Sequence, residues 1–90
     1  MFRYKITSIT DRQGIPKEEF LAELKKVHPN LTGRIEWPDK FMLSKSLMFV
    51  WDDESNKMLR TSRIEKIVCR TFGFEIVTKN SIYTLEKLKN

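Results

Sequence analysis

Alternating apolar and polar residues predict β-strands over much of this chain. Phe2, Tyr4 and Ile6 alternate with charged and hydroxyl residues at the N-terminus, which is the period-two pattern of a half-buried strand. Residues 41–51 are rich in strand-forming residues and are apolar on both parities, as expected of a strand that is covered on both sides. Residues 35–37 predict a shorter strand.

One helix is expected over residues 16–28. Pro16 suits the first helical turn, where its missing N–H would have had no partner. Pro29 favours an end at or before His28, and acidic residues near the start and basic residues near the end match the helix dipole. The apolar side chains form a single stripe of Phe20, Leu21, Leu24 and Val27.

The C-terminal third predicts a tight β-hairpin with Lys79 and Asn80 as its two loop residues. Directly opposed residues of a hairpin point to the same side. With this loop, the larger apolar side chains fall on one face and the polar ones on the other. The predicted pairs are Thr78 with Ser81, Ile76 with Tyr83, and Phe74 with Leu85.

The segment from Lys57 to Cys69 has two interpretations. Its β-branched residues and flanking turns favour a strand that bends near Thr61-Ser62. Its apolar residues also suit helical spacing, so a helix is the alternative.

These elements predict an α+β domain. One α-helix would pack on a mostly antiparallel β-sheet of about 4–6 strands that ends in the tight hairpin. A chain of 90 residues forms one hydrophobic core, so residues 1–90 are expected to be a single compact domain. An edge strand of such a sheet would allow a homodimer.

Positive charge changes this picture by suggesting an acidic partner. The formal net charge is +5, and one short stretch concentrates the cations. They are Lys57, Arg60, Arg63, Lys66 and Arg70. Such a ribbon is either a solvated outer face or a contact surface for phosphates or an acidic protein. A regular strand would divide these side chains between two faces, whereas a bend at Thr61-Ser62 would bring part of the ribbon together.

Two tryptophans are candidates for stacking on bases or on a partner. Trp37 and Trp51 each border a predicted turn, so either side chain would be partly exposed there. The alternative is packing in the core or at its rim. Exposed aromatic side chains beside basic groups are typical of sheets that bind single-stranded nucleic acid.

The sequence contains no recognisable catalytic or metal-binding motif. One cysteine, Cys69, and one histidine, His28, do not complete a tetrahedral zinc site or an intrachain disulfide. Neither is accompanied by the base and orienting group that a nucleophile needs, and Cys69 lies in an apolar run typical of an inert core thiol. The acidic residues 52–54 are interpreted as a soluble turn. No cofactor, metal or catalytic residue is therefore expected.

Two segments carry a resemblance. Residues 59–64, Leu-Arg-Thr-Ser-Arg-Ile, and residues 78–83, Thr-Lys-Asn-Ser-Ile-Tyr, are similar to the ends of some small phage and prophage proteins. The resemblance includes no catalytic motif and assigns no family. It implies a compact accessory protein that binds and blocks a host factor.

The expected function is that of a small, basic, non-enzymatic binding module. It would be nucleic-acid-associated or regulatory and would use the Lys/Arg ribbon beside the sheet. The alternative is a protein–protein inhibitor or adaptor of phage or mobile-element type, which would bind its partner stoichiometrically. The single cysteine and the absence of a hydrophobic signal core favour the cytoplasm, including that of an infected host cell, and no membrane association.

Overall fold

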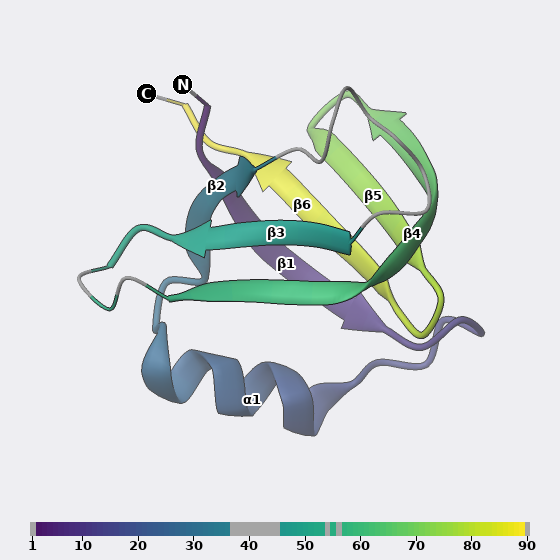
Figure 1. The fold of residues 1–90 in the computed structure, drawn as a ribbon, viewed down its shortest axis with the longest axis horizontal. Helices are drawn as coiled ribbons and strands as arrows, with labels where there is room; N and C mark the ends of the chain where they lie inside the picture. The colour runs from purple at the N-terminus through teal and green to yellow at the C-terminus, as the bar shows by residue number, and fades with distance from the viewer. Residues whose placement is uncertain (1, 37–45, 54, 56, 90) are drawn as a thin grey trace.

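The computed structural model describes residues 2–36, 46–53, 55 and 57–89. The chain forms a closed barrel of six antiparallel strands that neighbour one another in chain order, with one helix between the first two (Figure 1). The elements are β1 (Tyr4–Thr10), α1 (Glu18–Val27), β2 (Thr32–Glu36), β3 (Ser46–Trp51), β4 (Met58–Arg70), β5 (Gly73–Thr78) and β6 (Ile82–Lys87).

Barrel closure contradicts the predicted α+β fold of a helix packed on an open sheet. The first and last strands pair antiparallel from Tyr4 opposite Lys87 to Thr10 opposite Ile82. Strands of the barrel therefore cover one another's apolar faces across the interior, and a helix is not required to bury them. Each of the six described strands has a neighbour on both sides, so the edge strand that we expected to support a homodimer does not exist in this sheet.

The barrel interior is filled by aromatic and branched aliphatic side chains. Phe49 and Ile76 are fully buried near its centre. Gly33 on β2 makes room for the Phe49 ring, because a Cβ atom there would lie 2.7 Å from Phe49 Cε2 and 2.2 Å from the Val50 carbonyl oxygen. The other buried apolar residues are Tyr4, Ile6, Ile9, Leu31, Leu47, Trp51, Ile64, Tyr83 and Leu85.

The helix is confirmed, although it is shorter than predicted and plays a smaller part in the core. It spans residues 18–27, and none of its side chains is fully buried. Leu21 and Leu24 pack against the core, whereas Phe20 and Val27 are exposed. Figure 1 shows α1 lying along the outside of the barrel. Within the described parts of the chain, no helix is long and apolar enough to cross a bilayer.

The C-terminal hairpin has the predicted register. Phe74 lies opposite Leu85, and Ile76 lies opposite Tyr83. The segment from Lys57 to Cys69, for which the sequence allowed either a strand or a helix, lies almost entirely in the long strand β4. The predicted strand over residues 41–51 is β3 from Ser46 to Trp51, and residues 41–45 lie outside the described part of the chain.

Candidate functional site

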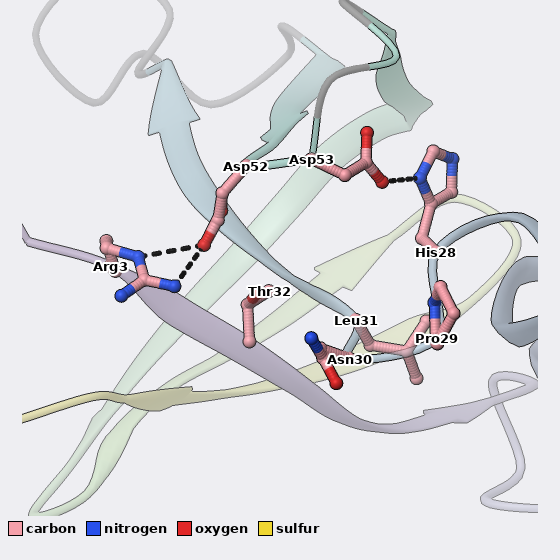
Figure 2. A pocket seen from close by; sticks show the side chains of 8 residues that line it. All are labelled: Arg3, His28, Pro29, Asn30, Leu31, Thr32, Asp52 and Asp53. Atoms are coloured by element: carbon pink, nitrogen blue, oxygen red, sulfur yellow. Dashed lines mark hydrogen bonds and ion pairs between the residues drawn. The ribbon is translucent and has the colours of Figure 1, made fainter.

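Two regions of the barrel bring together chemistry-bearing residues. The first is a hollow at the end of the barrel where the β3–β4 turn meets the α1–β2 turn. It has a volume of about 370 Å³ and is shown in Figure 2. Its lining residues are Arg3, His28, Pro29, Asn30, Leu31, Thr32, Asp52 and Asp53.

His28 is the centre of the interactions beside this hollow. Its Nδ1 atom forms a hydrogen bond with the Asp53 carboxylate, and its ring stacks on Trp51 with centroids 4.0 Å apart and planes 9° from parallel. The neighbouring Asp52 accepts two hydrogen bonds from the Arg3 guanidinium, as Figure 2 shows. The backbone N–H of Asp52 also donates to the Thr32 carbonyl at 3.1 Å.

These contacts hold the α1–β2 turn against the β3–β4 turn. They form a structural clamp, and they are not arranged as a catalytic site. His28 is only 5% exposed, and the residues that line the hollow include no serine or cysteine to act as a nucleophile. Among the described residues, no group of three or more His, Cys, Asp or Glu side chains is placed to hold a metal ion. No sequence pattern pointed to Arg3, Asn30 or Thr32. Asn30 and Thr32 line the hollow because they closely follow His28 in the chain, and Arg3 reaches it through its contact with Asp52.

The clamp should make the free energy of unfolding depend on pH. The hydrogen bond from His28, with further bonds from Ser55, lowers the pKa of Asp53 from 3.8 to about 2. A carboxylate with a lowered pKa in the folded state stabilises the fold above pH 4, and this contribution is lost as the pH falls through about 2. We therefore expect an Asp53→Asn variant to show less loss of unfolding free energy than the parent protein between pH 4 and pH 2, measured by urea denaturation. Equal losses in the two proteins would contradict the pairing.

The second region is the outer face of β4, where irregular pairing gathers the cations. Met48 of β3 lies opposite Arg60, and Ser46 lies opposite Arg63. Two residues of β4, Thr61 and Ser62, therefore stand opposite the single residue Leu47 of β3. The Thr61 hydroxyl accepts the Leu47 N–H at 3.0 Å inside this bulge. The bulge thus provides the bend that the sequence suggested at Thr61-Ser62.

A second bulge lies in the ladder between β4 and β5. Ile64 lies opposite Thr78 and Lys66 lies opposite Val77, so Glu65 is an additional residue in the strand. Ile64 and Thr78 are buried, and Lys66 is exposed together with Arg63. The two bulges therefore place cations spaced by three residues on one outer face, although a regular strand would alternate them. We call Arg60, Arg63, Lys66 and Arg70 the β4 basic strip.

The members of the strip differ in how far they are neutralised. Arg70 donates to the Glu75 carboxylate at 2.9 and 3.2 Å. Within the described part of the chain, Arg60, Arg63 and Lys66 form no ion pair with an acidic side chain, and Glu65 is paired with Arg12 instead. Lys57 is exposed just before β4. Three adjacent cations therefore remain available to an anion.

Of the two candidate aromatic residues, the described one, Trp51, does not join this face. Trp51 is 4% exposed and lies in the core, with Phe49 edge-on at 5.1 Å on one side and His28 on the other. Trp37 lies outside the described residues. Cys69, expected to be a core thiol, is exposed, because it lies one residue before the end of β4, where its partner Phe74 is itself only partly buried. The surface beside the strip is half-exposed aliphatic, with Met48, Val50 and Val77.

Comparison with known proteins assigns no family to this chain. No protein-family model, curated protein or solved structure matches it.

Proposed function

We propose that this barrel is a non-enzymatic binding module whose β4 basic strip holds the phosphates of a nucleic acid. The observation that carries the proposal is the pair of bulges that turns Arg60, Arg63 and Lys66 to the same outer face. With two β-bulges, β4 exposes cations at every third residue on one face, whereas a regular strand would place only every second residue there. The formal charge of +5 adds long-range attraction for a polyanion.

The chemistry of the strip suits phosphate. The two arginines offer planar forks that bind phosphate oxygens through two hydrogen bonds, and Lys66 offers a compact charge. Because contacts to phosphate carry no base information, we expect binding with little sequence preference.

A salt titration tests this proposal. Each phosphate contact gives a slope of about −0.9 in log K against log salt on duplex DNA, so three contacts give about −2.7. We expect a slope near −2.7 on double-stranded oligonucleotides and, at about −0.7 for each contact, near −2.1 on single-stranded ones, with binding followed by fluorescence anisotropy. Absence of binding at about 50 mM salt, where phosphate contacts are strong, would rule out the proposal.

An acidic protein surface is the second candidate partner, in the manner of a stoichiometric inhibitor or adaptor. The observation that favours it is the aliphatic surface beside the strip, where Met58 is 49% exposed and pairs with Val50. Protein interfaces combine apolar contacts with complementary charge. A chain that fails to bind oligonucleotides but retains an acidic protein in pull-downs, through the same arginines, would favour this second function.

A further inference from the structure

A second hollow, lined by exposed aromatic rings, lies just past the end of the β4 basic strip. After Arg70 the chain turns through Thr71 and Phe72 into β5. Phe72 is 47% exposed and Phe2 is 56% exposed. Both line an open hollow of about 720 Å³, together with Thr71, Glu86, Lys87, Leu88 and Lys89.

Backbone contacts between three segments hold these two phenylalanines near each other. The Lys87 N–H donates to the Phe72 carbonyl at 2.7 Å, and the Leu88 N–H donates to the Arg3 carbonyl at 2.8 Å. Figure 1 shows the two ends of the chain side by side at this end of the barrel. The rings are therefore presented from a fixed backbone at low cost in conformational entropy.

Cations accompany the rings. Lys87 Nζ lies 3.7 Å from the centroid of the Phe2 ring, and Lys89 lines the same hollow beside a single carboxylate, that of Glu86. Aromatic rings next to ammonium groups complement a nucleotide, since the ring stacks on the base and the ammonium attracts the phosphate. A duplex does not offer an unstacked base face, whereas a single strand does.

We infer that the nucleic acid held by the β4 basic strip is single-stranded and that one of its bases stacks in the Phe2–Phe72 hollow. This inference rests on the proposed function, because the strip supplies the phosphate contacts. The strip and the hollow are continuous along the chain, since Phe72 follows Arg70 by two residues. Phe2 and Phe72 thereby take the stacking role that the sequence suggested for Trp37 and Trp51.

The test compares a short oligothymidylate with an abasic strand of the same length and with a duplex of the same sequence length. We expect the parent protein to bind the oligothymidylate about 5-fold or more tightly than the abasic strand, as one base–aromatic stack provides. A Phe2→Ala/Phe72→Ala variant should lose this preference while it keeps the abasic-strand affinity and the salt slope. A Phe2→Leu/Phe72→Leu variant, which retains apolar side chains, should lose the preference as well.

The outcomes separate this inference from the proposed function. Equal affinity for the three probes, with a steep salt dependence, would overturn the stacking site and leave the phosphate-binding strip intact. A base preference that survives in both double variants would also overturn it. Absence of binding to every probe would overturn both proposals. Circular dichroism of the variants confirms that the barrel is folded before binding is compared.

Discussion

Replacement of Phe49 by alanine is expected to cause the largest loss of stability in this barrel. Phe49 is fully buried, contacts Trp51 edge-on and faces the space that Gly33 leaves open. Removing a buried phenylalanine ring costs about 3–5 kcal/mol through lost burial and a residual cavity. A domain of this size has a free energy of unfolding of roughly 5–13 kcal/mol, so the loss is a large share of the whole.

Urea denaturation of the Phe49→Ala variant measures this effect, with Phe72→Ala as the matched control. The control removes the same ring from a site that is 47% exposed, where we expect a change of about 0.5 kcal/mol or less. Similar destabilisation by the two substitutions would show that Phe49 is not at the centre of the core.

Reversing two charges of the β4 basic strip is expected to cause the largest loss of binding. Arg63→Glu/Lys66→Glu removes two cations that have no acidic partner among the described residues. Two charge-assisted contacts are worth about 3 kcal/mol or more, so affinity for an oligonucleotide should fall about 100-fold or more at moderate salt. The slope of log K against log salt should become shallower by about two.

A matched control separates local contact from net charge. Lys25→Glu/Lys26→Glu replaces two exposed cations of α1 and so lowers the formal charge by the same four units from +5. We expect this control to change the affinity far less than the strip variant does, because α1 is a separate element that packs outside the barrel. Equal losses in both variants would mean that overall charge, and not the strip, determines binding.

Local features of this protein were predictable from the sequence, whereas barrel closure was not. The hairpin register follows from the alternation around Lys79-Asn80, and the helix follows from its prolines and apolar stripe. Closure depends on a ladder between β1 and β6, and no local pattern records a pairing between opposite ends of a chain. An alternating strand has the same pattern in an open sheet and in a barrel.

The candidate sites were only partly predictable, because they also depend on how distant segments pair. The members of the β4 basic strip were identified from charge density alone, but their shared face depends on two bulges whose positions the sequence only partly indicates. Trp51 borders a turn, as predicted, yet His28 covers its ring. The presence of Phe2 and Phe72 in the lining of one hollow requires closure, since the two residues are far apart in the sequence.

Barrel closure also joins two strands that are synthesised at different times, β1 and β6. β1 is the first strand to leave the ribosome, and its longer ladder, to β6, involves the last strand of the chain, because Tyr4 pairs with Lys87. Its ladder to β2 has only two paired positions. Until residues 82–87 emerge, β1 and β5 each lack a neighbour and present edges on which other chains can add. Pairing of ends this distant costs loop-closure entropy and slows folding. In this barrel β6 is therefore the strand that covers the edges of both β1 and β5.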